Sequence, residues 1–142
     1  AIESLVNECR AAGIATAYRV LGSPRELAPQ IELVLYRVAQ EGMTNMRKYA
    51  QASSAEVTLD YRDKAHVRLT VRDSGVGTDE PSGGYGLIGV RERVQLVGGQ
   101  MQIETALGEG FTLRVRVPAQ HSRSGIHTRE SSIKPRTGNA SE

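Results

Sequence analysis

Three short motifs, each carried by a different kind of predicted element, constrain the fold of this chain most strongly. Residues 40–48 (QEGMTNMRK) fall on a helix, residues 73–77 (DSGVG) end a strand, and residues 84–93 (GYGLIGVRER) lead into another helix. Together they supply a metal ligand, a carboxylate for the edge of a base, and glycine turns for phosphate. Each motif alone is common, but three in this order, each on a suitable element, favour a nucleotide site.

The length and composition fit one domain with a core of its own. The chain has 142 residues, and its single cysteine, Cys9, excludes a disulfide framework and fits a reducing compartment. No apolar run approaches the roughly 20 residues of a membrane span, and nothing resembles a signal peptide. We therefore expect a cytoplasmic domain without direct membrane contact. Because the chain begins with Ala-Ile-Glu, in the middle of a predicted helix, we also expect a fragment of a longer protein.

The net charge of +2 does not indicate a nucleic-acid surface. Residues 119–142 hold four basic and two acidic side chains, so the rest of the chain is neutral overall. After Pro118 the apolar pattern stops, and Ser, Thr, Gly, Arg and Glu dominate. We therefore predict a folded domain over residues 1–118 and a flexible tail over residues 119–142.

Hydrophobic periodicity predicts the order of helices and strands. Three stretches with helical spacing are found, over residues 2–12, 29–50 and 87–97. Five alternating stretches predict strands, over residues 14–20, 57–61, 67–71, 101–105 and 111–117. This order predicts an α+β fold, a two-layer α/β sandwich in which a mixed, mostly antiparallel sheet packs on about three helices.

A polar strip borders the apolar stripe of the long helix. Glu41, Asn45 and Lys48 are spaced by four and three residues, so an α-helix places them on one side. The amide oxygen of Asn45 is a hard ligand suited to Mg²⁺, and Lys48 can reach a phosphate. Glu41 can act as a base or order the hydration shell of the metal. An ordinary surface strip, with Glu41 paired to a basic residue, explains the same spacing about equally well.

Asp73 continues the alternation of the strand before it. Val67, Leu69 and Val71 precede it at every second position, so its carboxylate is predicted on the apolar face. Such a carboxylate is costly unless it is paired, and an adenine amino group would pair it. Gly75, two residues further, lets the backbone approach a ligand. The alternative is a local turn in which the aspartate accepts a hydrogen bond from its own backbone.

The third motif combines a glycine-rich loop with a helix start. The first amides of a helix lack partners and attract anions, and glycines at 84 and 86 allow close approach of a polyphosphate. Residues 74–86 are long enough and rich enough in small residues for a mobile lid. Tyr85 either lines the pocket or packs on the loop. Arg91 and Arg93 are predicted to be solvated or paired rather than bound to phosphate.

Residues 31–118 resemble the ATP-binding catalytic domain of sensor histidine kinases, in the subgroup of nitrate and membrane-fluidity sensors. That domain has the Bergerat-type ATP-binding fold shared with gyrase, Hsp90 and MutL. The resemblance rests on four motifs in order, similar to the N box, the G1 box, the G2 box with its helix, and the last glycine box: residues 35–45, 73–77, 84–94 and 108–112.

The resemblance implies a role for each candidate residue. Asn45 would ligate Mg²⁺, Asp73 would accept from the adenine amino group, and Lys48 would contact phosphate, while Glu41 would be the catalytic residue. Thr112 would support Asp73 through a hydrogen bond or a water. The residues that would shape the ATP pocket and its lid are Gly75, Gly77, Gly84, Tyr85, Gly86 and Leu87. The chain departs from the family pattern at Gly42, Tyr49 and Ser74, where Ala, His and Asn are usual.

The resemblance also implies partners outside this chain. Such kinases transfer the γ-phosphate of Mg-ATP to a histidine on a dimerising helical hairpin, and then to a response regulator. No such hairpin fits in this sequence, so we expect a monomer with little turnover alone, from a parent that is cytosolic or membrane-anchored. Two alternatives are an anti-sigma-factor-type serine kinase of the same fold and a non-catalytic nucleotide-binding regulatory module.

Overall fold

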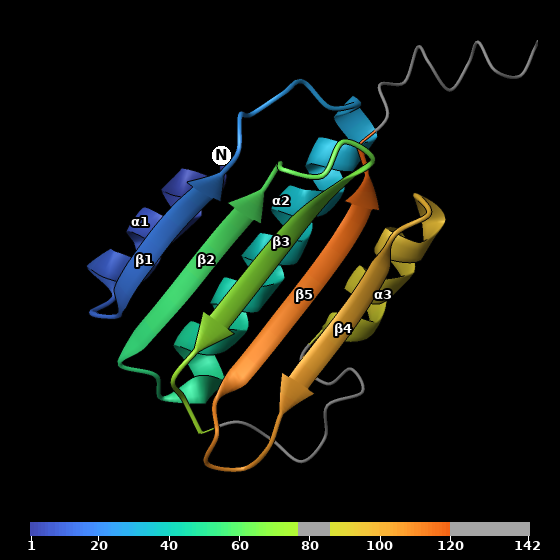
Figure 1. The fold of residues 1–142 in the computed structure, drawn as a ribbon. Helices are drawn as coiled ribbons and strands as arrows, with labels where there is room; N and C mark the ends of the chain where they lie inside the picture. Colours follow the sequence, from blue (N-terminus) through green and yellow to red (C-terminus); the bar gives the residue numbers. More distant parts are fainter. Residues whose placement is uncertain (77–85, 120–142) are drawn as a thin grey trace, which may run out of the picture.

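A five-stranded sheet forms one layer of the molecule (Figure 1). The computed structural model describes residues 1–76 and 86–119. Its strands are β1 (Ala15–Leu21), β2 (Ser54–Asp60), β3 (His66–Asp73), β4 (Gln100–Thr105) and β5 (Phe111–Pro118). They lie in the order β1-β2-β3-β5-β4, with β1 and β2 parallel and every other neighbouring pair antiparallel.

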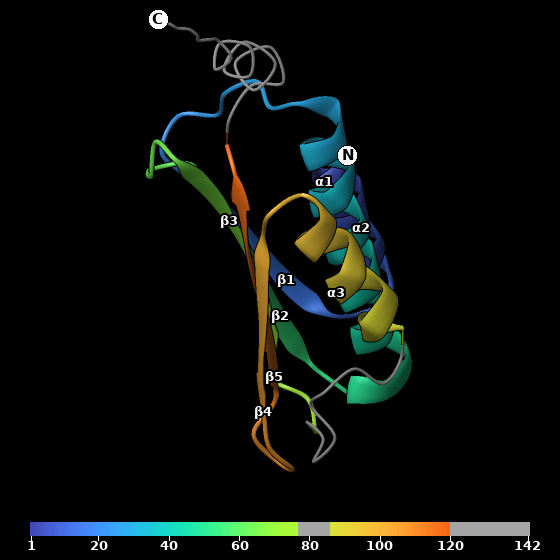
Figure 2. The ribbon, with the colours of Figure 1, turned by 90° about the vertical axis from the view of Figure 1, so that its right-hand side faces the viewer.

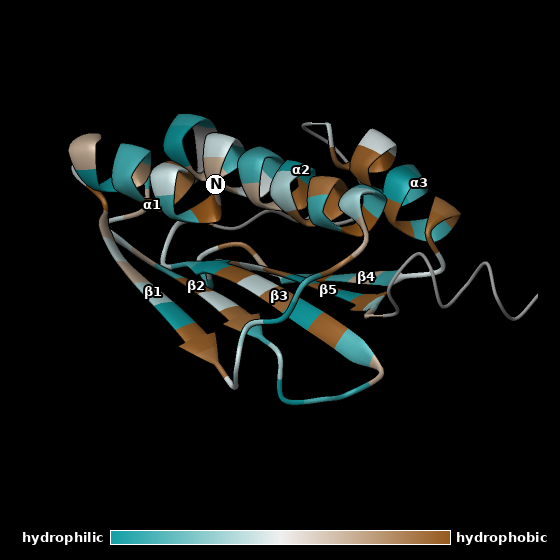
Figure 3. Cartoon of the chain, turned by 90° about the horizontal axis from the view of Figure 1, so that it is seen from above, coloured by the Kyte–Doolittle hydropathy of each residue, from teal (hydrophilic) through white to brown (hydrophobic). Residues whose placement is uncertain are grey.

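The helices form the second layer, on one side of the sheet (Figure 2). They are α1 (Ile2–Ala11), α2 (Pro29–Asn45), the π-helical turn η1 (Met46–Ala50) and α3 (Leu87–Leu96). Figure 3 shows the helices side by side above the strands. No described element covers the opposite side, which is named the open face below. The predicted two-layer α+β sandwich with a mixed, mostly antiparallel sheet is confirmed.

The core lies between the two layers because both carry apolar residues with the period of their own secondary structure. In β3, Val67, Leu69 and Val71 are at most 3% exposed, whereas the residues between them face outward. The stripe of α2 meets them with residues that are all buried: Ile31, Val34, Leu35, Val38, Gly42 and Met43. Asp73 and Thr16 are the buried polar residues of the described chain.

One predicted element differs from the structure. The helix expected over residues 29–50 is α-helical only to Asn45 and then widens into η1, which ends at Gln51 with a left-handed backbone (φ 54°). A π-turn closes hydrogen bonds over five residues instead of four. The apolar pattern conceals the change, because Met46 is still 2% exposed. None of the described helices is both long and apolar enough for a membrane span.

The β2–β3 hairpin gives a prediction about pH. Arg62 donates from Nη2 and Nε to the two oxygens of Asp60 at 2.9 and 3.0 Å, and this pairing lowers the pKa of Asp60 to about 2. The ion pair contributes fully above the ordinary pKa of an aspartate, and its contribution disappears as the pH falls through about 2. We expect Arg62→Ala to return the pKa of Asp60 toward its usual value, measured by NMR titration of the carboxyl carbon. An unchanged pKa would contradict the assigned cause.

Candidate functional site

Asp73 is the buried acidic group around which the candidate site is built. It ends β3 and is 9% exposed, and its side chain is on the helix side together with those of Val67, Leu69 and Val71. The predicted strand phase is therefore confirmed. Its neighbours across the sheet are Ala55 in β2 and Phe111 in β5.

The Asp73 carboxylate is only half satisfied. Its Oδ1 accepts a hydrogen bond from the Gly75 backbone N–H at 2.7 Å, so the local turn considered as an alternative is formed. Within the described residues the other oxygen, Oδ2, has no hydrogen-bond donor. Burial raises the pKa of Asp73, and the bond from Gly75 partly opposes this shift. The turn and a ligand contact are compatible, because they use different oxygens.

Gly110 lies directly behind Asp73. Its φ is +77°, and a Cβ added there would collide with the backbone carbonyl oxygen of Asp73. The Thr105 hydroxyl donates to the Gly110 carbonyl at 2.7 Å, which fixes the same corner. The close approach of β5 to the end of β3 therefore requires glycine at this position.

The strand register corrects one expectation. Phe111, not Thr112, is opposite Asp73; Thr112 is opposite Arg72 and alternates with the buried Leu113, so its side chain is on the open face. Of the two forms of support expected from Thr112, the direct hydrogen bond to Asp73 is not formed within the described residues. Phe111 is half-buried and packs against the core beside the carboxylate. The apolar alternation from Phe111 to Val117 in the sequence already indicates that Phe111, and not Thr112, is on the core side of the sheet.

Two departures from the family pattern have visible packing reasons. A Cβ on Gly42 would lie 3.3 Å from Leu113 Cδ2 and 3.5 Å from Val71 Cγ1, so glycine lets α2 approach the sheet closely next to Asp73. The Ser74 hydroxyl accepts the Ser54 backbone N–H at 3.1 Å, which extends the β2–β3 contact past the last ladder pair.

The polar strip of the long helix is at the same end of the molecule. Glu41 and Asn45 are half-buried in the last turns of α2, and Lys48 is exposed in η1. The expected single α-helical strip therefore continues only from Glu41 to Asn45, because the π-turn changes the winding before Lys48. In the part of the chain that the structure describes, Glu41 forms no ion pair, so the surface-pair alternative is not realised.

The Glu41 carboxylate contacts the start of α3. A Cβ on Gly86, the N-cap residue of α3 with φ +87°, would fall 2.9 Å from Glu41 Cδ and 3.3 Å from Oε1. The positive end of the α3 dipole stabilises a carboxylate at this position. Leu87 follows Gly86 and is 2% exposed in the core, so any ligand contact from it would come from its backbone N–H. This contact between two distant motifs has no direct signal in the sequence.

Figures 1 and 2 show the end of β3, the start of β5, the end of α2 and the start of α3 at one end of the molecule. The structure thus brings together Asp73 with Gly75, and Glu41 with Gly86. Gly77, Gly84 and Tyr85, together with most of the predicted lid over 74–86, lie outside the described residues. Residues 120–142 of the predicted tail also lie outside the described residues, whereas its first residue, Ala119, is buried and donates from its backbone N–H to Ala65.

Other candidates have structural roles. Arg91 donates from Nη1 to the Met101 carbonyl at 3.0 Å, which ties α3 to β4. Cys9 is a buried free thiol, and burial raises its pKa. Among the described residues no group of three or more His, Cys, Asp or Glu side chains is placed to hold a metal. A Mg²⁺ site built on one amide oxygen, phosphates and water does not need such a group.

The sequence of this chain is similar to a known protein family and to proteins of known function. Residues 30–121 match the family described as histidine kinase-, DNA gyrase B-, and HSP90-like ATPases. The signal transduction histidine-protein kinase/phosphatase DegS of Brevibacillus brevis is 31% identical over 109 residues, and the oxygen sensor histidine kinase NreB of Staphylococcus carnosus is 37% identical over 110. Each alignment covers 75% of this chain but only 28% and 31% of those proteins, so the chain spans less than a third of their length.

Solved structures share the fold at lower sequence identity. The blue-light activated histidine kinase EL346 of Erythrobacter litoralis superimposes with a TM-score of 0.66 at 21% identity, covering 87% of this chain and 42% of that one. The catalytic domain of histidine kinase ThkA has a TM-score of 0.64 at 17% identity, covering 82% of this chain and 91% of that domain. The two-layer architecture is therefore that of histidine kinase catalytic domains.

Proposed function

Because this chain belongs to the family of histidine kinase-, DNA gyrase B-, and HSP90-like ATPases, we propose that it is the ATP-binding catalytic domain of a sensor histidine kinase. The observation that carries the proposal is the buried Asp73 carboxylate with one oxygen satisfied by Gly75 and the other without a donor in the described chain. A buried polar atom of this kind needs a partner, and the amino group of adenine supplies the required donor. The residues present therefore fit an adenine nucleotide.

Different neighbouring residues would contact the base and the phosphates of the nucleotide. Phe111, half-buried beside Asp73, would form an apolar wall against the base and exclude water from the carboxylate. Gly75 would let the backbone approach it. Lys48 and the amides at the start of α3 would hold the phosphates, with Gly77, Gly84 and Tyr85 contributing from the lid.

Asn45 and Glu41 are assigned to the metal side of the site. The Asn45 amide oxygen would ligate Mg²⁺, which screens phosphate charge when bound. The Glu41 carboxylate is next to Gly86, at the same helix start that attracts phosphate, so carboxylate and phosphate would repel unless a cation or ordered water lies between them. This geometry favours Glu41 as an organiser of the metal's hydration shell in the ground state. Glu41 would accept the proton of the attacking imidazole only as the phosphate transfers.

The transfer itself needs groups outside this chain. The acceptor would be a histidine on the dimerisation domain of the same kinase, with a response regulator receiving the phosphate afterwards. The isolated domain would be a monomer with little turnover. The relatives are named histidine kinases, and among the described residues no feature favours the serine kinase or the non-catalytic module.

Calorimetric titration tests the metal assignment. We expect a non-hydrolysable ATP analogue to bind the unchanged chain more tightly with Mg²⁺ than without it. Asn45→Ala should remove that difference, a loss of about tenfold in affinity with Mg²⁺ and little without it, the scale of one contact to a charged group. Asn7→Ala, on the exposed side of α1, is the control and should keep the full metal dependence. Undiminished metal dependence in Asn45→Ala would refute the assignment.

A further inference from the structure

The open face carries a concentration of arginine over β3, β5 and β4. The outward-facing positions of these strands hold four arginines, here called the arginine face: Arg68, Arg72, Arg114 and Arg116. Glu104 is the acidic side chain among the outward positions of the same three strands. Because the helices cover the other side of the sheet, the arginine face is separate from the candidate nucleotide site (Figure 2).

The arrangement of these arginines is unfavourable for the isolated domain. Arg68 is directly opposite Arg116 on neighbouring antiparallel strands, where like charges destabilise a sheet. Arg72 is opposite Glu56 in the sheet but forms no ion pair within the described residues, because Glu56 pairs with Arg19. Arg114 pairs with Glu104 at 2.8 Å, and Arg68 pairs with Asp63 at 3.5 Å and is opposite Asp60 in the sheet, although Asp60 is already paired with Arg62. Arg116 donates only to the neutral amide of Gln100, at 2.8 Å.

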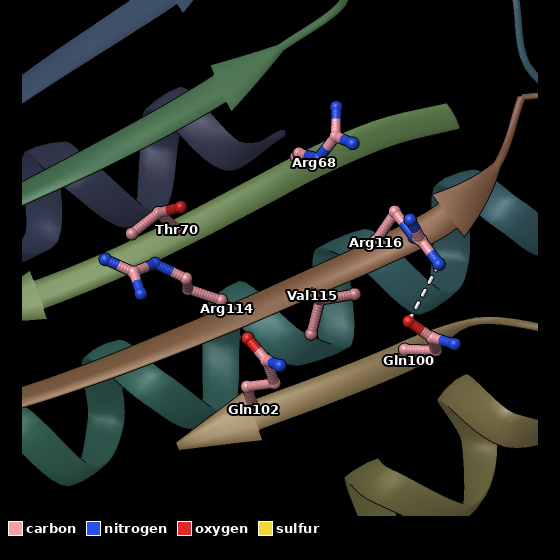
Figure 4. Close-up of a pocket in the computed structure, with 7 residues that line it drawn as sticks. All are labelled: Arg68, Thr70, Gln100, Gln102, Arg114, Val115 and Arg116. Carbon is pink, nitrogen blue, oxygen red and sulfur yellow. Dashed lines mark hydrogen bonds between the residues drawn. The ribbon is translucent and has the colours of Figure 1, made fainter. Parts of the chain in front are cut away.

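The face is hollowed where the arginines meet. A depression of about 260 Å³ is lined by residues from three strands, none of them acidic: Arg68, Thr70, Gln100, Gln102, Arg114, Val115 and Arg116. Figure 4 shows the guanidinium groups and the two glutamine amides around this depression, with the bond from Arg116 to Gln100 at one side. These groups offer hydrogen-bond donors in a geometry that suits carboxylates, since a guanidinium binds both oxygens of one carboxylate.

The adjoining half of the open face is balanced in charge. On β2, Glu56 and Asp60 face outward; Glu56 pairs with Arg19 at 3.4 Å and Asp60 with Arg62. The outward positions of β3, β4 and β5 also contain no Phe, Tyr or Trp on which nucleic-acid bases stack.

We propose that the arginine face is a docking surface for a carboxylate-rich segment of a partner protein. A protein segment can place acidic side chains against Arg68 and Arg116, whereas nucleic-acid bases would find no aromatic side chain to stack on among the outward positions of these strands. Residues 119–142 of this chain are not the occupant, because their basic residues outnumber their acidic ones. The proposal does not depend on nucleotide binding.

The test is an NMR titration of the ¹⁵N-labelled chain with a soluble oligo-glutamate peptide. We expect the amide shifts to concentrate at residues 68–72, 100–104 and 112–116, and the affinity to fall as salt is added. Arg68→Glu/Arg116→Glu should weaken binding on the order of tenfold or more. Arg37→Glu/Arg93→Glu, a matched charge change on the exposed sides of α2 and α3, should leave it unchanged.

Three results would overturn the proposal. The first is peptide shifts spread evenly over all basic surfaces, and the second is equal effects of the two double variants. The third is a single-stranded oligonucleotide that binds the same residues more tightly than the peptide. A neutral variant, Arg68→Gln/Arg116→Gln, guards against misfolding: it should melt no lower than the unchanged chain, because it removes a like-charge pair. A large drop in its melting temperature would show that the arginines serve the fold instead.

Discussion

Asp73→Asn is expected to weaken binding of ATP tenfold or more while leaving the nucleotide-free domain at least as stable as the unchanged chain. The Asn side chain keeps an oxygen to accept the Gly75 N–H, so its NH₂ group would face the amino group of adenine, donor against donor. Loss of a hydrogen bond to a charged group costs roughly 1.5–3 kcal/mol, which is tenfold to more than a hundredfold in affinity. Calorimetric titration with an ATP analogue measures this loss.

Asp73→Asn should raise the folding stability of the domain, or leave it unchanged, although it lowers the affinity for ATP. The raised pKa of Asp73 means that its ionisation opposes folding, a cost that is present at neutral pH and disappears as the pH falls below the ordinary pKa of an aspartate. Asn removes the cost, so the melting temperature at neutral pH should be equal or higher. Asp60→Asn is the matched control: the pKa of Asp60 is lowered, so its loss should reduce stability and leave ATP affinity unchanged. Full ATP affinity in Asp73→Asn would refute the proposed base contact.

Gly110→Ala should be among the most destabilising single-methyl changes in this chain. Its backbone is left-handed, which costs a side chain about 1–2 kcal/mol, and the new methyl group would meet the Asp73 carbonyl oxygen. A backbone atom cannot rotate away, so we add the roughly 1–3 kcal/mol of an overpacked site, for a total of about 2–5 kcal/mol. Chemical unfolding of the two proteins measures the difference.

Gly108→Ala separates the two causes. Gly108 has nearly the same φ, +78°, but an added Cβ would have no atom within 4 Å. Gly108→Ala should therefore be destabilised only by the backbone strain, about 1–2 kcal/mol. If Gly110→Ala were no more destabilising than Gly108→Ala, the contact between β5 and the end of β3 would not be the reason for glycine. A shift of Asp73 caused by Gly110→Ala should also weaken ATP binding, whereas Gly108→Ala should not.

Much of the fold was predictable because it depends on local periodicity. Every strand and helix of the structure falls within a residue or a few of its predicted range, since the apolar residues on each element are also the ones it buries. The burial of Asp73 followed from the same rule, because a side chain two residues after Val71 on a strand points to the same side. This strand-phase argument distinguishes Asp73, as a buried group that could bind a ligand, from an aspartate in an ordinary surface turn.

The parts that could not be predicted depend on contacts between distant segments. The Arg68–Arg116 juxtaposition depends on which strands are neighbours and in what register, and the π-turn after Asn45 leaves the apolar stripe unchanged. The contact between Glu41 and Gly86 joins residues on different helices. The sequence by itself therefore determined the elements, their buried sides and the placement of Asp73, because these follow from the periods of helix and strand. Only the tertiary structure decided which residues meet across elements, because strand register and helix packing are properties of the assembled layers.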